Sequence, residues 1–389
     1  MSAVTVPRTL GLFVVSALLS ACMGGAVPPQ SLRQTGAAFS SMPAPAGYRV
    51  IFSFDGKKDG DGPRGALLAV KGFFYGITTG GGKFGNGVVF RISPSGQQAV
   101  VYAFKGGTSD GRIPNGPLIE VNGVLYGTTT RGGANDSGIF FSLTTSGKEK
   151  VIYSFGSTES PTGPLFYDKG VFLGTEVGFG SDRGSVYKIT PQGAFKAIYY
   201  FQGQPDCYNP LDSGITVVKS ILYGTARYGG AFGNGCIFKI KAGKEGVLYS
   251  FKGGKDAQQP TSGVIAVNGT LYGTAGGGTK SDGTVFRATL LGKEHVLYAF
   301  KGYPNDGSVP NSPPLDIKGN LYGVTDSGGP HNSGTIFKVD AAGHETVLYA
   351  FKGQPDGSSP AGALIDSSGK LYGTTSSGGK YGFGTVFTI

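Results

Sequence analysis

The most unusual carboxylate of this sequence is Glu176. It occupies a position of an internal repeat that is otherwise Thr or Ala, and the same loop adds Asp182. A pair of carboxylates is the usual minimum for glycoside hydrolysis, with one group acting as general acid. These two residues are therefore candidates for catalysis on an extracellular polysaccharide. An ion pair between neighbouring repeats, made with Arg131 or Arg227, would explain the same carboxylate without any chemistry.

A second group of residues could bind a ligand without reacting with it. Its members are aromatic or cationic, fall in the long loops of the repeat and differ from one unit to the next, as a specific binding surface requires. The candidates are Phe84, Arg131, Phe179, Arg183, Tyr228, Phe232, Lys280, His331 and Tyr381. Drift of loops that no function constrains would produce the same variety, so the sequence leaves both interpretations open.

The cysteines and histidines predict a disulfide and no metal site. Cys207 and Cys236 both belong to the long-loop end of one repeat, and we predict that they form a disulfide, which an exported protein can keep. The three histidines fall on different parts of the repeat and cannot easily surround a metal ion. The sequence has no P-loop and no G-x-S-x-G nucleophile motif with partners, and we expect no cofactor.

An aspartate recurs in the connection between units. A calcium loop needs several oxygen ligands within one loop, whereas most of these connections offer one carboxylate. We therefore predict turns in which each aspartate accepts a hydrogen bond from its own backbone. The series is Asp59, Asp110, Asp206, Asp256, Asp306 and Asp356.

The elements that must position all these residues are short strands in a tandem repeat. The stretch Leu-Tyr-Gly-Thr-Thr at residues 125–129 returns, with variations, about every 50 residues. One unit predicts strands at 116–121, 124–130, 138–143 and 150–155, with Asn122-Gly123 as a hairpin turn. Four antiparallel strands in a unit of this length are typical of a propeller blade.

The two ends of the repeat region are complementary. The third-strand aromatic residue and the aromatic-x-Phe pair of the fourth strand each occur seven times. The chain begins with a lone fourth strand near residues 48–54, and its last unit stops after a third strand. If these fragments pair, residues 48–389 form a closed, all-β, seven-bladed β-propeller without a free sheet edge at the seam.

The repeat also resembles a known family. The pattern F-x-G-x-x-D-G, then P, G-x-L, G-x-L-Y-G-T-T, G-G and G-T-V-F looks like the GloVer tandem repeat of bacterial choice-of-anchor surface proteins. The resemblance extends from Tyr48 to Ile389. It implies a surface location and a repeat fold, and it brings no established reaction or ligand.

The N-terminus predicts export and a lipid anchor. Residues 1–21 have the shape of a signal peptide, with Arg8 before an apolar segment too short to span a membrane. The segment ends in Leu-Ser-Ala-Cys, which resembles a bacterial lipobox with Cys22 as the lipidated residue. Residues 22–47, rich in Gly, Ala, Pro and Ser, predict a flexible tether. The expected destination is the cell envelope, and the outer membrane if the cell has one.

Composition limits the partners. The formal charge is +10, but Lys and Arg are scattered through the repeats, whereas a nucleic-acid surface requires them clustered. We expect a non-enzymatic binding or scaffolding module that contacts the membrane through its lipid and a polysaccharide or envelope protein through its long-loop face. An enzyme acting on extracellular polysaccharide, or a protein-interaction hub of an envelope complex, are the alternatives.

Overall fold

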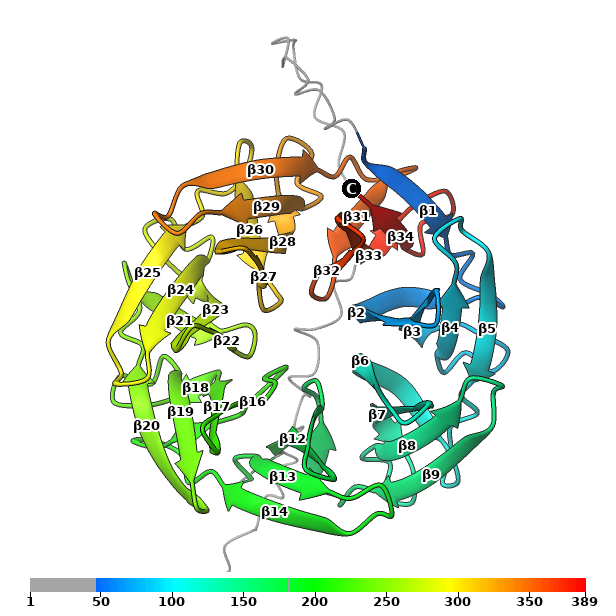
Figure 1. Ribbon diagram of the computed structural model, residues 1–389, viewed down its shortest axis with the longest axis horizontal. Coiled ribbons are helices and arrows are strands. Elements are labelled where there is room, and N and C mark those ends of the chain that lie inside the picture. The colour runs from blue at the N-terminus through cyan, green and yellow to red at the C-terminus, as the bar shows by residue number, and fades with distance from the viewer. Residues whose placement is uncertain (1–46, 179, 181) are drawn as a thin grey trace, which may run out of the picture. The chain divides into compact units, whose positions relative to one another are not determined.

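The computed structural model describes residues 47–178, 180 and 182–389. The predicted signal peptide, Cys22, the predicted tether up to residue 46 and Phe179 lie outside the described residues. Seven sheets, arranged as blades around one axis, form a ring of β-strands (Figure 1), which confirms the predicted seven-bladed propeller. No helix of the described part is long and apolar enough to cross a bilayer.

Blade 2 shows why the sequence forms these sheets. Asn122 and Gly123 connect its first two strands with φ of 53° and 82°, the left-handed pair that a two-residue hairpin requires. A Cβ on Gly127 would lie 2.7 Å from the ring of Phe141, so this glycine makes room for the third-strand aromatic residue. The strands pair in sequence order and are β6 (Gly111–Val121), β7 (Val124–Gly132), β8 (Ile139–Thr144) and β9 (Glu149–Ser154).

The other blades repeat this order. Their second strands are β3 (Phe73–Gly80), β12 (Val171–Gly178), β17 (Ile221–Ala226), β23 (Thr270–Gly277), β28 (Asn320–Gly328) and β33 (Lys370–Gly378). The third strands are β4 (Val88–Ile92), β13 (Ser185–Ile189), β19 (Cys236–Lys241), β24 (Thr284–Thr289), β29 (Thr335–Val339) and β34 (Thr385–Thr388). The outer strands are β5 (Gln98–Ala103), β14 (Phe195–Tyr200), β20 (Lys244–Ser250), β25 (Glu294–Ala299), β30 (Glu345–Ala350) and β1 (Arg49–Ser53).

The innermost strand differs from the single short strand that the sequence predicts. β2 (Asp61–Val70) and β6 change register midway. Blade 4 has β16 (Thr216–Val218), preceded by β15 (Cys207–Tyr208), which pairs with β18 (Tyr228–Gly229). The remaining blades divide the strand into two pieces, namely β10 (Glu159–Pro161) and β11 (Phe166–Asp168), β21 (Ala257–Pro260) and β22 (Ile265–Val267), β26 (Gly307–Pro310) and β27 (Leu315–Ile317), and β31 (Gly357–Pro360) and β32 (Ile365–Ser367).

The interruption serves contacts between blades. Where the chain leaves the ladder, its carbonyl groups accept hydrogen bonds from the threonines of the preceding blade. Thr225 Oγ1 donates to the carbonyl of Ser262 at 2.7 Å, and Thr274 Oγ1 donates to that of Ser312 at 3.0 Å. The threonines of the repeated Leu-Tyr-Gly-Thr-Thr stretch therefore link neighbouring blades near the axis.

The first and last strands close the ring. β1 pairs antiparallel with β34, with Arg49 opposite Thr388 and Ser53 opposite Thr385. β1 thereby becomes the outer strand of blade 7, as the complementary ends of the sequence predict. The pairing leaves β34 with a neighbour on each side, so the seam has no open edge.

Each of the seven junctions between blades is filled by two aromatic rings. The ring that follows one outer strand meets the third-strand ring of the next blade edge to face, with centroids 5.0–5.5 Å apart. Such a pair contributes about 0.5–1.5 kcal/mol beyond the burial of its surface. The pairs are Phe54–Phe90, Phe104–Phe141, Phe155–Tyr187, Phe201–Phe238, Phe251–Phe286, Phe300–Phe337 and Phe351–Phe387.

Candidate functional site

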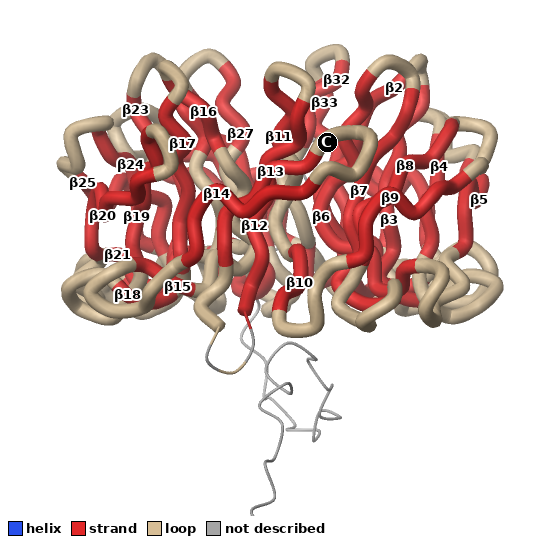
Figure 2. Tube along the Cα trace, turned by 90° about the horizontal axis from the view of Figure 1, so that it is seen from below, coloured by secondary structure: helices blue, strands red, loops and turns tan. Residues whose placement is uncertain are grey.

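The long connections of the blades gather at one end of the ring. They join second to third strands and one blade to the next, and Figure 2 shows them at the lower end, opposite the hairpins between first and second strands. The amide of Gly133 donates to the carbonyl of Gly107 at 3.0 Å and so joins the two kinds of connection. We call this end the long-loop face. Variable loops on a rigid scaffold are where binding residues are expected.

Three aromatic rings project from equivalent loops of this face. Six blades carry a glycine pair after the second strand, and we call the residue two places beyond it the tip position. Phe84, Phe232 and Tyr381 hold the tip position in blades 1, 4 and 7 and are 45%, 55% and 48% exposed. The other blades that share this loop place Asn135, Lys280 and His331 there, all exposed. The nine loop candidates therefore include five residues of one structural position.

Lysines accompany two of these rings. The Nζ atom of Lys83 lies 5.2 Å from the ring centroid of Phe84, and that of Lys380 lies 5.0 Å from Tyr381. Tyr381 and Lys380 also line a pocket of about 450 Å³ beside β1. Two of the three aromatic tips thus have a lysine beside the ring, and Tyr381 also borders concave surface.

A pocket with a volume of about 600 Å³ lies between blades 1 and 2. Arg112 and Asp136 form an ion pair in its wall, with Nε to Oδ1 at 3.1 Å and Nη2 to Oδ2 at 2.7 Å. The guanidinium group holds the pKa of Asp136 below its usual range. The lining residues are Asn86, Gly106, Gly107, Thr108, Arg112 and Gly133 to Asp136. Sequence inspection missed this site because its residues come from four separate segments.

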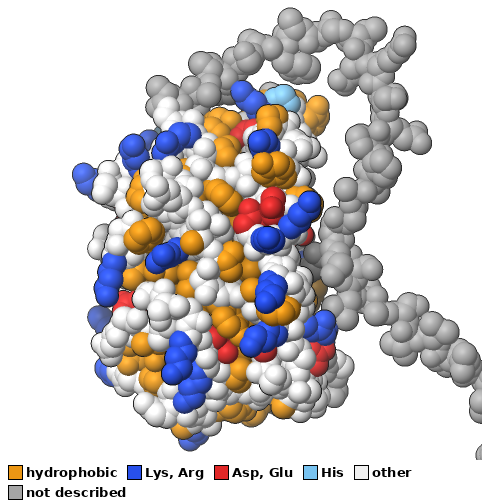
Figure 3. Space-filling view, turned by 90° about the vertical axis from the view of Figure 1, so that its right-hand side faces the viewer, with side chains coloured by type: hydrophobic (Ala, Val, Ile, Leu, Met, Phe, Trp, Pro, Cys, Tyr) orange, Lys and Arg blue, Asp and Glu red, His pale blue; other side chains and the backbone are white. Residues whose placement is uncertain are grey.

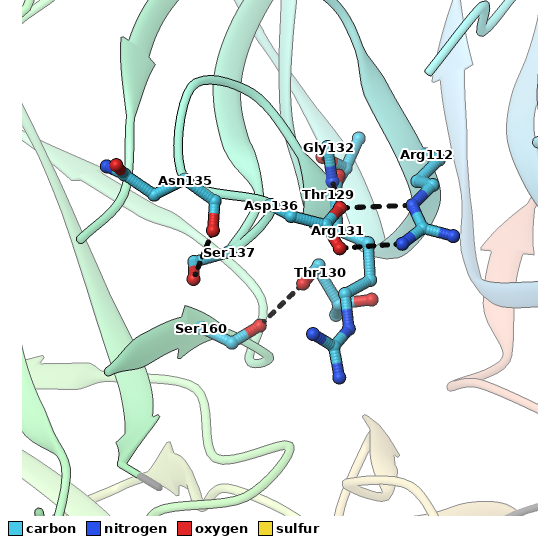
Figure 4. Close-up of polar contacts among 9 residues, drawn as sticks. All are labelled: Arg112, Thr129, Thr130, Arg131, Gly132, Asn135, Asp136, Ser137 and Ser160. Atoms are coloured by element: carbon cyan, nitrogen blue, oxygen red, sulfur yellow. Dashed lines mark hydrogen bonds and ion pairs between the residues drawn. The ribbon is translucent and has the colours of Figure 1, made fainter. Parts of the chain in front are cut away.

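Figure 4 shows the second-to-third strand loop of blade 2 beside this pocket. The amide of Gly132 donates to Asp136 Oδ1 at 2.9 Å, so the aspartate is fixed from two sides. Arg131, a candidate from the sequence, extends away from the ion pair of Arg112 and Asp136.

Arg183 and Tyr228, two further candidates, come together at blades 3 and 4. The guanidinium carbon of Arg183 lies 5.1 Å from the ring of Tyr208. That ring lies 5.5 Å from Tyr228, which has the guanidinium of Arg227 at 5.8 Å on its own ring. The four side chains form a stack of cations and aromatic rings, an arrangement with attractive cation–π contacts.

Glu176 lies on β12 and does not have the accessible side chain that a catalytic candidate requires. Its side chain is fully buried, with 0% exposure, and Oε2 accepts a hydrogen bond from Ser185 at 2.9 Å. Burial and the nearby Glu159 raise the pKa of Glu176 to about 8. The neighbouring charges that act on Glu176 are those of two carboxylates, Glu159 and Asp182, where the sequence suggested an arginine. The second catalytic candidate, Asp182, accepts a hydrogen bond from Gly184 at the loop.

Four junctions share a cluster of tyrosine, aspartate and glutamate that the sequence analysis missed. The tyrosine of one outer strand donates to the aspartate of the next connection at 2.7–2.9 Å. A glutamate at the first or second position of the following outer strand lies beside them. We call these the junction clusters: Tyr102–Asp110–Glu149, Tyr199–Asp206–Glu245, Tyr249–Asp256–Glu294 and Tyr298–Asp306–Glu345.

The glutamates of the junction clusters are set for protonation. Burial raises their pKa, and the neighbouring aspartate raises it further, to about 7 for Glu149 and Glu345 and about 8 for Glu245 and Glu294. Blade 7 uses Tyr48 at this position, whose hydroxyl donates to the connecting aspartate at 2.6 Å. The glutamates occupy the same position in successive repeat units, and this recurrence is the sequence signal that could have revealed them.

The aspartates do make the predicted turns. Asp110 Oδ1 accepts a hydrogen bond from the amide of Gly111 at 2.6 Å, and Oδ2 accepts from that of Lys105 at 2.7 Å. The tyrosine hydroxyl is the additional partner that burial of the carboxylate requires. These residues therefore support the blade junctions.

Cys207 and Cys236 are joined by a disulfide, with Cα atoms 6.0 Å apart. The bond ties β15 to β19 on the long-loop side of blade 4. Asp206, Cys207 and Glu245 are close enough together to suggest a metal site. A thiolate is required for metal binding, and the sulfur of Cys207 is already bonded to Cys236.

Cations are scattered over one side of the ring. Figure 3 shows the side that lies at the right in Figure 1, where Lys and Arg are spread among apolar and neutral side chains. Such a distribution provides a basic surface without the stripe that follows a nucleic-acid backbone.

Solved structures share the fold at low sequence identity. A puromycin hydrolase is 10% identical with a TM-score of 0.52, over 82% of this chain and 50% of that chain. A prolyl endopeptidase is 13% identical with a TM-score of 0.40, over 75% of this chain and 50% of that chain. The xyloglucan PUL GH43B of Bacteroides ovatus is 14% identical with a TM-score of 0.37, over 77% of this chain and 56% of that chain. This chain thus spans about half of each of the first two, and the likeness to the puromycin hydrolase shows the fold alone. No curated protein matches the chain.

A protein family is shown by the repeat itself. The model of the Gloeobacter/Verrucomicrobia repeat matches residues 23–238 and 215–389. The two matches together include every blade described above. The chain therefore belongs to the Gloeobacter/Verrucomicrobia repeat family.

Proposed function

We propose that this protein is an exported, non-enzymatic module that binds carbohydrate through its long-loop face. The observation that carries the proposal is the aromatic tip position. An exposed loop tip is usually polar, yet Phe84, Phe232 and Tyr381 expose about half of their surface there. A single exposed aromatic side chain is common on a protein surface, but its recurrence at one structural position of three loops supports a binding role. Their flat rings offer the apolar contact that the C–H faces of a sugar ring can cover.

Concave surface beside the tips supports a ligand of modest size. The pocket at blades 1 and 2 and the pocket beside β1 have volumes of about 600 Å³ and 450 Å³. Both lie within the range of about 300–1,000 Å³ that is typical of small-ligand sites. Tyr381 lines the second pocket, so one tip residue stands directly at such a site.

The proposed place of action is the cell envelope. The signal-like segment and the lipobox at Cys22 support an N-terminal lipid anchor, and the tether of residues 22–47 would hold the propeller near the membrane. Labelling of cells with a radioactive fatty acid tests this proposal. The wild-type protein is expected to incorporate label that Cys22→Ala removes, and equal label in both would contradict it.

The enzymatic alternative receives no support from Glu176. A general acid must reach its substrate, and the side chain of Glu176 is fully buried. The neighbouring Glu159, which is partly exposed, raises the pKa of Glu176 but leaves its side chain buried. We therefore assign Glu176 to the stability of blade 3.

A glycan array tests the proposed function. The chain without residues 1–21 is applied at low and physiological salt. Saturable binding to one glycan class at both salt concentrations is expected, and Phe84→Ala should weaken it by about tenfold, a typical loss for an aromatic contact. Binding that vanishes with salt would indicate only attraction of a basic protein to acidic polymers. Absence of binding would overturn the proposal in favour of a protein partner.

A further inference from the structure

We infer that the pocket between blades 1 and 2 binds one unit of an uncharged glycan by hydrogen bonds to its hydroxyl groups. This inference rests on the proposed function and identifies its site and ligand class. Segments from two blades converge on the pocket. They are Asn86 after β3, residues 106–108 between β5 and β6, Arg112 on β6 and residues 133–136 after β7.

The charges of the pocket neutralise each other. Arg112 uses two N–H groups for Asp136, one to each carboxylate oxygen. A guanidinium group has five N–H donors, so three remain for a ligand or for water. An anionic ligand would meet the carboxylate of Asp136, and a cationic one would meet Arg112. Hydroxyl groups both donate and accept hydrogen bonds, which suits a wall that offers paired donors and acceptors without net charge.

One amide of the wall is oriented as an acceptor. The Nδ2 group of Asn86 donates to the carbonyl of Lys105 at 2.8 Å, which leaves its Oδ1 as the acceptor for a ligand. The amide of Asn135 points away from Arg112 and Asp136 (Figure 4) and donates to the carbonyl of Phe155 at 2.9 Å. Side chains held in this way lose little conformational entropy on binding, so the site is organised in advance for a polyhydroxylated ligand.

Small residues keep the pocket open. A Cβ on Gly107 would meet no atom within 4 Å, and Ala134 contributes only a methyl group to the exposed wall. A tryptophan at position 134 is expected to fill this space. Blade 5 provides a matched control, because Thr279 is exposed and follows the glycine pair of its loop as Ala134 does. The loops also share a hydrogen bond, from Gly133 to Asp110 and from Gly278 to Asp256.

The test measures binding of a panel of neutral and uronic-acid oligosaccharides by titration calorimetry, with the chain lacking residues 1–21. We expect neutral glycans to bind with an affinity that changes little between low and high salt. Ala134→Trp should weaken binding at least about tenfold, and Asp136→Asn, which frees Arg112 but keeps a side-chain acceptor, about fivefold. Thr279→Trp should bind as the wild-type protein does. Thermal melting of each variant establishes that it is folded.

The outcomes separate the inference from the proposed function. Unchanged glycan binding by folded Ala134→Trp and Asp136→Asn would overturn the pocket as the site while the proposed function stands. Equal losses in Ala134→Trp and Thr279→Trp would also overturn it. Binding of uronic-acid glycans alone, abolished by salt, would overturn the uncharged ligand class. A wild-type protein that binds no member of the panel would overturn the proposed function together with the inference.

Discussion

At the scale of single residues, Glu176 illustrates what the type of a residue can and cannot reveal. The sequence identifies it because every other repeat has Thr or Ala at this position. Its environment depends on strand register, which places it opposite Pro161 on one side and Ser185 on the other. Burial then determines its chemistry. A rare carboxylate in a repeat was a sound reason for interest, but its accessibility could be established only in three dimensions.

Replacement of Glu176 by glutamine is predicted to stabilise the protein at alkaline pH. The folded-state pKa of about 8 lies above the usual value. The stability that Glu176 contributes is therefore complete below pH 4.5 and is lost as the pH rises through about 8. Glutamine can still accept the hydrogen bond of Ser185 and cannot ionise. At pH 9, we expect the free energy of unfolding of Glu176→Gln to be about 1–3 kcal/mol higher than that of the wild-type protein. Urea denaturation measures this difference. A lower stability, or loss of glycan binding, would contradict the structural role.

The pocket residues mark the limit of sequence inspection at this scale. The tip residues could be predicted because they fall in loops that vary between repeats. Arg112 and Asp136 are 24 residues apart, and nothing in their spacing indicates contact. Their contact follows from the pairing of β6 with β7, which sets Arg112 opposite Arg131, close to the loop that carries Asp136. The apolar pattern does not encode this position of the loop.

At the scale of elements, the junction clusters predict that the propeller is more stable at mildly acidic than at alkaline pH. Each of the four glutamates has a pKa raised to about 7 or 8 by burial and by its aspartate neighbour. Their stabilising contribution is present below the unfolded-state value and lost as the pH rises through 7 to 8. The melting temperature should accordingly fall between pH 5 and pH 8.5, and each Glu→Gln variant should remove about a quarter of the fall.

Position 98 is a natural control for this prediction. Gln98 opens the outer strand of blade 1, where the four clusters have glutamate. The variant Gln98→Glu should steepen the loss of stability with pH, while Glu294→Gln should reduce it. Calorimetric melting of both variants at pH 5 and pH 8.5 provides the comparison. An equal change in melting temperature between pH 5 and pH 8.5 in the two variants and the wild-type protein would contradict the role assigned to the clusters.

The disulfide predicts a second effect at this scale. Cys207 and Cys236 close a loop with a sequence separation of 29 residues. A cross-link of this length stabilises a folded protein by about 3–4 kcal/mol through the unfolded state. The double variant Cys207→Ala/Cys236→Ala should therefore have a free energy of unfolding that is lower by about this amount. Urea titration measures the difference. Labelling of both thiols in the non-reduced wild-type protein would show that the bond is absent.

At the scale of the whole molecule, the sequence was most informative. A period of about 50 residues and complementary ends predict a closed ring because β pairing favours a partner for every edge. The innermost strand was the exception. Its division into two pieces depends on hydrogen bonds with the neighbouring blade, such as the one from Thr225 to Ser262. Hydrogen bonds between blades do not alter the alternation of apolar and polar residues along a strand, so the sequence does not reveal them.

Ring closure predicts a strong effect of removing β1. A chain that lacks residues 1–54 loses the strand that pairs with β34 and the ring of Phe54 that packs on Phe90. Truncation of a buried phenylalanine alone costs about 3–5 kcal/mol, and the exposed edge should promote association. A chain that lacks residues 1–46 keeps β1 and serves as control. Chromatography with light scattering measures the mass of each chain, and thermal melting measures its stability. Only the control is expected to be a monomer with the stability of the wild-type protein. Equal behaviour of both chains would contradict closure by β1.

The measurement that tests the account most directly is titration of the best glycan of the array into the triple variant Phe84→Ala/Phe232→Ala/Tyr381→Ala. Leu291→Ala is the control, because Leu291 is 96% exposed on a hairpin of the opposite end of the ring. The account predicts that the triple variant loses about 100-fold or more in affinity, while the control binds as the wild-type protein does. Wild-type affinity in the folded triple variant would contradict binding through the long-loop face.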